Sequence, residues 1–182
     1  TSYFSEMNGD IEIDVMNSLG FDVVCLGNHE FDNGTKELAR RLKNLKAKVV
    51  CANYDFEDSP LEDVVHPYVI IKKAGMKIGV IGLLTDIRRV VDKKIAAEFS
   101  YIEPADVVNR YAEYLKNEKG CDLVMCLSHL GYEEDKEVAA LIRNVDVIVG
   151  GHTHTLLHKK QEVKDLDGKP VVIVQNWKWG LN

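Results

Sequence analysis

The sequence lacks a long apolar run, an excess of basic residues and any low-complexity tract. No apolar stretch approaches the ~18 residues that a membrane-spanning helix requires, so we expect no membrane span. The formal net charge of -6 gives no electrostatic reason to expect a nucleic-acid polymer or an anionic membrane as a partner. Hydrophobic residues make up 46% of the chain, which is ordinary for a folded globular protein and argues against disorder.

Cysteine is scarce and is not arranged for a structural metal. The four cysteines, Cys25, Cys51, Cys121 and Cys126, include no CxxC pair, so we expect no zinc knuckle. Three of them lie inside apolar runs, where a reduced thiol packs as a small hydrophobe. Their spacing does not require a disulfide and does not exclude one.

The 182 residues are enough for one domain with a sizeable core and too few for two, so we expect residues 1–182 to form a single domain. Helical and strand-like periods alternate along the chain, which predicts an α/β fold with a largely buried sheet. Two helices have apolar faces that we expect to be buried: Met7, Ile11, Val15 and Leu19 in the first, and Val138, Leu141 and Ile142 in the last. We expect helices over 7–19, 35–45, 104–115 and 133–144, strands over 21–27, 48–52, 68–73, 76–84, 122–127 and 146–149, further strands between 156 and 175, and loops over 53–67 and 85–103.

Three segments share one local design, in which an apolar strand ends at a small residue and then delivers polar side chains that can bind a metal. The segments are 22–30, 122–129 and 146–154. Loops at the carboxyl ends of parallel strands line the binding crevice of open α/β sheets. We therefore expect one sheet edge to gather five side chains: Asn28, His29, His129, His152 and His154.

A single histidine after a strand is more often a hydrogen-bonded structural residue than a ligand. We assign no role to His66 and His158, which lack this context. The His152-Thr-His154 pair is only suggestive alone, although residues two apart in an extended segment point to the same side. The prediction rests on a coincidence: four of the six histidines fall just past three predicted strands.

Three ordered motifs carry a resemblance to a known family. The run Gly27-Asn-His-Glu-Phe-Asp32, then Ser128-His129, then Gly150-Gly-His-Thr-His154 closely resembles the calcineurin-like metallophosphoesterase superfamily. The longer run from Leu26 to Gly34 resembles its 5′-nucleotidase and UDP-sugar hydrolase branch. The resemblance implies an α/β fold of the four-layer α/β/β/α sandwich type.

The resemblance also implies a metal site with two divalent ions, for which Zn, Mn, Fe and Co are all suitable. Asn28, His129 and His152 would bind one ion, and His154 would bind the other. The family's bridging aspartate and its Asp-x-His motif have no counterpart in this sequence. We therefore expect the chain to be partial at its N-terminus, without the first strand or strands, and without the C-terminal domain that holds the substrate in this branch.

His29 and Asp32 have different implied roles. In the family, the histidine at the position of His29 touches the transferring phosphoryl group or protonates the leaving oxygen, and Asp32 would hold its ring. The alternative for Asp32 is a turn or a helix cap that leads into Asn33-Gly34, and the motif favours the role as partner of His29. The implied reaction is hydrolysis of a small-molecule phosphate ester by metal-activated water, with nucleoside 5′-monophosphates or nucleotide sugars as substrates.

Two alternatives remain open. The chain is either an active hydrolase or an inactive, metal-poor fragment that keeps only the fold. An unrelated amidohydrolase using His152 and His154 ranks low, because that fold carries its HxH pair on the first strand of a longer barrel.

A missing strand would leave an unpaired sheet edge, so a dimer or a retained N-terminal segment is expected. Relatives of this branch imply a periplasmic or extracellular location.

Overall fold

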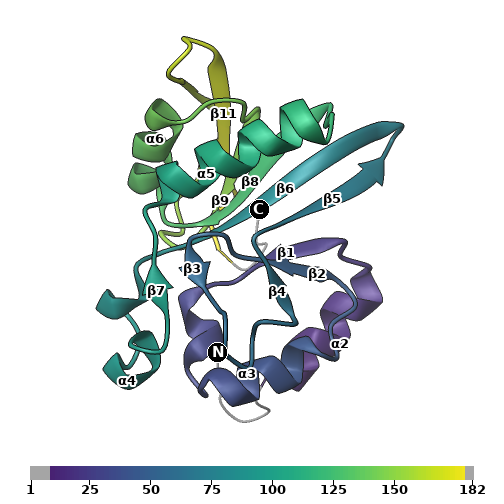
Figure 1. Cartoon of the computed structure of the whole chain (residues 1–182), viewed down its shortest axis with the longest axis vertical. Helices are drawn as coiled ribbons and strands as arrows, with labels where there is room; N and C mark the ends of the chain where they lie inside the picture. The colour runs from purple at the N-terminus through teal and green to yellow at the C-terminus, as the bar shows by residue number, and fades with distance from the viewer. Residues whose placement is uncertain (1–8, 179–182) are drawn as a thin grey trace.

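Two β-sheets packed face to face form the centre of the molecule (Figure 1). The computed structural model describes residues 9–178. The smaller sheet has three parallel strands in the order β1 (Val23–Cys25), β2 (Lys48–Val50) and β4 (Val65–His66). The larger sheet has six, in the order β10 (Gln161–Lys164), β11 (Pro170–Gln175), β9 (Val147–Gly150), β8 (Leu123–His129), β6 (Met76–Leu84) and β5 (Tyr68–Lys73).

Helices cover the outer face of each sheet and complete four layers (Figure 1). Beside the smaller sheet lie α2 (Asp10–Leu19) and α3 (Thr35–Leu42), and beside the larger sheet lie α5 (Pro104–Glu113), which continues as a π-helical turn over Tyr114–Glu118, and α6 (Tyr132–Leu141). A short pair, β3 (Tyr54–Asp55) with β7 (Ser100–Tyr101), and the helix α4 (Lys93–Ala96) flank the smaller sheet. The α/β/β/α sandwich expected from the sequence is confirmed.

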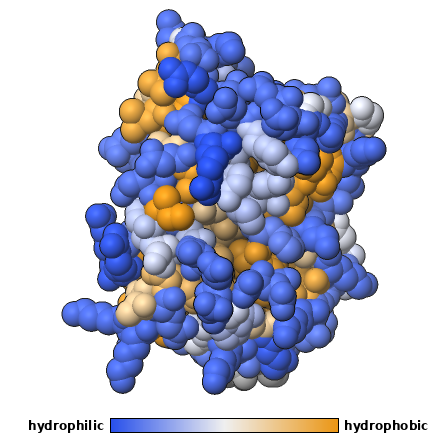
Figure 2. All heavy atoms as spheres, viewed as in Figure 1, coloured by the Kyte–Doolittle hydropathy of each residue, from blue (hydrophilic) through white to orange (hydrophobic). Residues whose placement is uncertain are grey.

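Each sheet has its own apolar core on its helical side. One core packs Ile81, Val124 and Ile148 of the larger sheet under α5 and α6. The other packs Leu26, Phe31 and Val49 against α3 and the β3–β7 pair. Polar side chains cover most of the face seen in Figure 2, with apolar patches across its middle. Among residues 9–178, no helix is long and apolar enough to cross a membrane.

The two sheets touch through their backbones at Gly82 on β6. The amide of Ala52 donates a 2.8 Å hydrogen bond to the Gly82 carbonyl. A methyl group added to Gly82 would overlap the Val50 carbonyl oxygen at the end of β2. Glycine at this position therefore lets the carboxyl ends of β2 and β6 come together, and this brings the loops that follow the strands of both sheets into one region.

Local turn chemistry agrees with the sequence where glycine supplies an unusual backbone angle. The strands expected over 68–73 and 76–84 pair as a hairpin, and its turn residues Ala74 and Gly75 both have positive φ. Between the strands expected over 156–175, a turn joins β10 to β11, with Gly168 at φ 76° and the Asp165 carboxylate accepting from two backbone amides of the turn. All four cysteines are free thiols.

The predicted buried face of the first helix is wrong. Ile11, Val15 and Leu19 of α2 are exposed, Leu19 by 70%, whereas Ile13 is only 7% exposed. The helix instead turns its Ile13 and Met16 side towards β1 and α3, where they line a small cavity. Met7 lies outside the described residues.

Two further predictions need correction. Leu141 is 55% exposed because α6 ends there and the chain becomes extended at Ile142, which takes the buried position instead. The predicted loops contain β3 and β4 in the first, and a 3₁₀ turn over Ile87–Arg89, α4 and β7 in the second. These elements are two to four residues long, and such short elements leave no periodic pattern for sequence analysis to detect.

Candidate functional site

The predicted site residues follow strands of two different sheets. Asn28 opens a 3₁₀ turn (Asn28–Phe31) after β1 of the smaller sheet, His129 ends β8, and His152 follows β9 of the larger sheet. The sequence predicted a single sheet edge, and this detail is wrong. The site instead lies where the carboxyl ends of the two facing sheets meet.

Three of the predicted ligands lie together. The Oδ1 atom of buried Asn28 is 3.1 Å from Nε2 of His129. The His129 and His152 rings pack with their centroids 5.0 Å apart and their planes tilted by 58°. We call Asn28, His129 and His152 the ligand cluster.

Gly27 makes room for this arrangement. A methyl group built on Gly27 would lie 3.0 Å from two atoms of the His129 ring and 2.7 Å from Oε2 of Glu30. That Glu30 oxygen accepts a 2.6 Å hydrogen bond from the Gly27 amide, and burial raises the pKa of the Glu30 carboxyl. Glu30 thus fixes the turn that carries Asn28.

The segment after β9 holds its histidines in unusual backbone conformations. His152 has φ 70° and His154 has φ 52°, which non-glycine residues adopt only when the surroundings impose it. Buried Gln175 of β11 donates a 2.6 Å hydrogen bond to the Gly151 carbonyl, and the Thr153 hydroxyl accepts from the Tyr132 amide at 3.1 Å. These contacts hold the backbone on both sides of His152.

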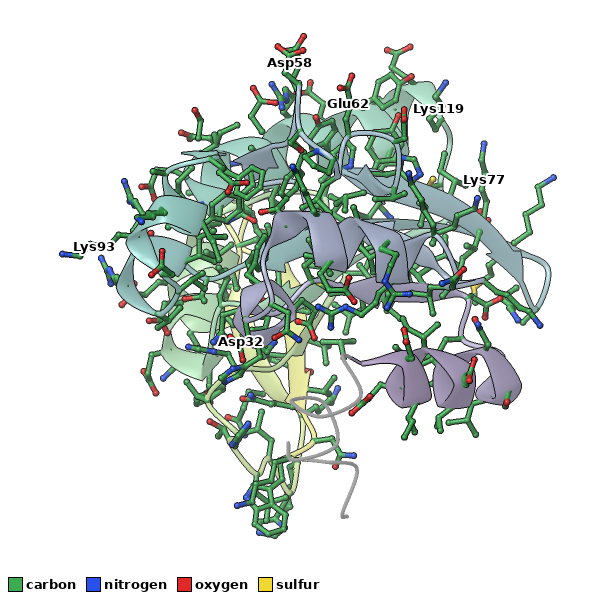
Figure 3. All side chains as sticks on the ribbon, turned by 90° about the horizontal axis from the view of Figure 1, so that it is seen from below. Asp32, Asp58, Glu62, Lys77, Lys93 and Lys119 are labelled. Carbon is green, nitrogen blue, oxygen red and sulfur yellow. The ribbon has the colours of Figure 1, made fainter. Side chains whose placement is uncertain are left out.

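His29 and Asp32 form a pair at the rim. The His29 ring nitrogen Nδ1 lies 2.9 Å from Oδ2 of Asp32, and the His29 side chain is 78% exposed. Figure 3 labels Asp32 on the segment that precedes α3. The exposed edge of the His29 ring is therefore available to an incoming molecule. His154 is also exposed, and its charge contributes to lowering the pKa values of His129 and His152.

Burial and neighbouring histidines keep the imidazoles of the ligand cluster neutral. Burial, together with the smaller effect of the charges of His152, His29 and His154, lowers the pKa of His129 to about 4. Burial also lowers the pKa of His152. Neutral imidazole is the form that binds a metal, so the cluster is ready to accept one near neutral pH without first losing a proton.

The donor atoms fit a divalent cation. An amide oxygen and two imidazoles form the mixed oxygen and nitrogen set that suits Zn, Mn, Fe or Co. Two donors bound to one ion at about 2.1 Å each lie about 3 Å apart, which matches the 3.1 Å between Asn28 and His129. In the described part of the chain, no group of three or more His, Cys, Asp or Glu side chains is arranged to hold a metal. The ligand cluster therefore has three metal-binding side chains only when the amide oxygen of Asn28 is counted.

Sequence reasoning missed a buried carboxylate behind the cluster. Asp135 of α6 is 1% exposed, and its Oδ1 accepts a 2.5 Å hydrogen bond from the Ser128 hydroxyl. Burial raises the pKa of Asp135 to about 7. A signal was present, because Asp135 precedes Val138 and Ala139 by three and four positions and so shares their buried helix face.

Comparisons with known proteins find relatives over nearly the whole chain. A family model described as calcineurin-like phosphoesterase matches residues 7–156. A probable 5′-nucleotidase of Treponema pallidum is 33% identical over 99% of this chain and 33% of its own length. A snake venom 5′-nucleotidase of Gloydius brevicauda is 32% identical over 99% of this chain and 33% of its own length. The chain thus spans about one third of the length of these relatives.

The solved structures include a close match in fold. The 5′-nucleotidase precursor from Thermus thermophilus superposes with a TM-score of 0.93 and 36% identity, covering 99% of this chain and 38% of that one. Relatives of this kind include secreted or precursor forms, and calcineurin-like phosphoesterases generally use divalent metals. These matches remove the amidohydrolase alternative. With three ordered motifs, a four-layer sandwich and a family model matching most of its length, the chain belongs to the calcineurin-like phosphoesterase family.

Proposed function

We propose that this chain is a catalytic domain that hydrolyses phosphate esters of nucleotides with the help of divalent metal ions. The observation that carries the proposal is the ligand cluster, in which Asn28 and His129 lie 3.1 Å apart and His152 packs on His129. Members of the family hydrolyse phosphate esters, and the relatives named above are 5′-nucleotidases. Because the chain spans one third of their length, the activity of the whole protein is part of this proposal.

The ligand cluster would hold one cation, and His154 would contribute to a second. When bound, two divalent ions neutralise phosphoryl oxygens and lower the pKa of a water molecule that attacks phosphorus. His129 is largely buried, the backbone beside His152 is held by Gln175, and the two rings pack on each other before any ion arrives. The protein therefore does not have to reorganise these side chains during binding.

His29 and Asp32 would act on the leaving group. The departing alkoxide of a phosphate ester is a poor leaving group, so a proton or a positive charge placed near it speeds the reaction. Asp32 holds Nδ1 of His29 at 2.9 Å, which leaves the other ring nitrogen free to approach the substrate oxygen. This is the role of a general acid or charge stabiliser.

Nucleoside 5′-monophosphates or nucleotide sugars are the proposed substrates. The first follow from the 5′-nucleotidases among the relatives, and the second from the resemblance of the run from Leu26 to Gly34 to the UDP-sugar hydrolase branch. A periplasmic or extracellular location is proposed from the secreted and precursor forms among the relatives.

A second copy of the chain, or a retained N-terminal segment, could pair with β1, which lies at the edge of the described three-stranded sheet. Sedimentation analysis of the purified chain would test the pairing.

The deciding experiment measures metal content and hydrolysis together. Purified chain is loaded with Mn²⁺ or Zn²⁺, dialysed, analysed for metals, and assayed with nitrophenyl phosphate and AMP. We expect bound metal and turnover that is lost in His29→Ala but kept in His158→Ala, an exposed histidine outside the motifs. Bound metal with turnover unchanged in His29→Ala would overturn the role of His29.

A second candidate is a metal-poor domain that keeps the fold without the activity. It is favoured by the lack, among residues 9–178, of any group of three His, Cys, Asp or Glu side chains arranged for a metal. The same experiment separates the two, because this candidate binds one ion or none and shows no turnover with either substrate.

A further inference from the structure

We infer that Asp135 is a positioning residue that fixes the relative placement of His129 and His152. The inference rests on the proposed function, because it treats these two histidines as metal ligands. Asp135 itself lies on the helical side of the larger sheet, and its carboxylate contacts the two strands that carry these histidines rather than the histidine rings. It would act through the backbones that carry the two ligands.

The first link runs from Asp135 to His129. The Ser128 hydroxyl donates to Oδ1 of Asp135 at 2.5 Å and accepts from the Leu130 amide at 3.2 Å. Ser128 and Leu130 are the two neighbours of His129 in the chain. Along β8, buried and half-buried residues alternate, so Ser128 points towards α6 while His129 points towards the smaller sheet. Holding Ser128 therefore fixes the position from which the His129 ring projects.

The second link runs from Asp135 to His152. A methyl group built on Gly150 would overlap Oδ2 of Asp135, so this oxygen lies directly against the Gly150 backbone. Gly150 ends β9, two residues before His152. The two strands are parallel neighbours, with Leu127 opposite Val149. One carboxylate thus contacts the ends of both strands just before each delivers its histidine.

The burial of Asp135 argues against a purely incidental position. Its Oδ2 atom is buried and has no hydrogen-bond partner among the described residues. A buried carboxyl oxygen without a hydrogen-bond partner lowers the stability of the fold. A hydrophobic residue of similar size would pack there with a smaller loss of free energy. Such a cost is typical of positions that serve a site, where strain or unsatisfied groups persist because the arrangement is needed.

The test measures cation affinity and stability of the metal-free chain side by side. Co²⁺ binding is followed by its visible absorption in the parent chain, in Asp135→Ala, in Asp135→Asn and in a control, Asp165→Ala. Asp165 is another buried aspartate, 7% exposed, whose carboxylate accepts backbone hydrogen bonds in the β10–β11 turn. Thermal unfolding of each variant without metal reports the structural cost alone.

Loss of a residue that orients a metal ligand typically costs about 10–100-fold in affinity. We expect Asp135→Ala to weaken Co²⁺ binding by about that factor, and Asp165→Ala to leave it within about twofold even where both lose similar stability. Asp135→Asn keeps an acceptor for Ser128 and should retain most of the affinity. In a Ser128→Ala background, Asp135→Ala should have a smaller effect than in the parent chain.

Each contrary result has its own meaning. If the parent binds Co²⁺ and Asp135→Ala binds it equally well, the positioning role is wrong and the proposed function stands. If Asp135→Asn loses as much affinity as Asp135→Ala, the route through the Ser128 hydrogen bond is wrong. If the parent binds no Co²⁺, the metal assignment falls and the inference falls with it.

Discussion

The amide oxygen of Asn28 lies 3.1 Å from Nε2 of His129, although the two residues are 101 positions apart in the chain. Asn28 follows a strand of the smaller sheet, and His129 ends a strand of the larger one. The pair therefore exists only when the two sheets are packed on each other. Metal binding at this pair should report the integrity of the whole sandwich.

Asn28→Ala should remove the only amide donor of the ligand cluster. Because even residues that merely orient a ligand are worth about 10–100-fold in affinity, we expect a loss of at least about 100-fold for Zn²⁺. Calorimetric titration in competition with a chelator measures this loss. His158→Ala provides the control and should bind Zn²⁺ as the parent does. If Asn28→Ala weakens Zn²⁺ binding only slightly, the assignment of Asn28 as a metal ligand is wrong.

His29→Ala should separate chemistry from metal binding. His29 is exposed and outside the ligand cluster, so the metal content of the variant should equal that of the parent. Turnover of AMP should fall by about 10²–10⁴-fold, the usual contribution of a general acid or base. Asp32→Asn should give a smaller loss, because the ring keeps a neutral partner. Parallel elemental analysis and steady-state assays measure both quantities, and a loss of metal in His29→Ala would contradict the division of roles.

The stability of the metal-free chain should fall as the pH falls from 6.5 to 4 because of His129. Its pKa is about 4 in the folded chain and 6.5 when unperturbed, so in this window the unfolded state binds a proton that the folded state resists. Above pH 6.5 the His129 ring is neutral in both the folded and the unfolded chain, so its titration does not change the free energy of unfolding. The difference of about 2.5 pKa units corresponds to about 3 kcal/mol.

Urea unfolding of the parent and of His129→Gln, across that pH range and with a chelator present, isolates this effect. Asp135 has the opposite effect on stability. Folding raises its pKa from 3.8 to about 7, so its contribution destabilises the folded chain increasingly as the pH rises between those values. Both chains carry Asp135, so the difference between them cancels its contribution. A pH-independent difference would show that His129 is not held neutral.

Gly82→Ala should destabilise the fold more than Gly79→Ala on the same strand. The added methyl group at Gly82 meets the Val50 carbonyl, which belongs to the backbone of the other sheet and cannot move aside. At Gly79 its three nearest atoms all belong to a side chain, that of Leu115, at 2.9 to 3.2 Å, and a side chain can shift more easily than a backbone carbonyl. We expect a loss of about 3 kcal/mol or failure to fold for Gly82→Ala, and about 1 kcal/mol for Gly79→Ala. Denaturant unfolding compares the two, and equal losses would contradict the close approach of the sheets.

Much of the fold was predictable because long elements leave a strong pattern. The strands around Val80 and Val124 and the turn at Gly75 follow directly from apolar runs and glycine. The face of α2 was not predictable, because Ile11, Val15 and Leu19 form as good an apolar stripe as the one that includes Ile13. Helical periodicity shows that a face exists, but the packing partners decide which face is buried.

The same division holds for the candidate site. The sequence alone determined the residue types, since a strand followed by Asn28, His129 or His152 places a potential ligand at a strand end. Only the tertiary structure decided that Asn28 belongs to a different sheet from the two histidines, and that Asp135 lies behind both of their strands. The reason is physical: local sequence governs period and turn, whereas the pairing of sheets depends on contacts between residues far apart in the chain.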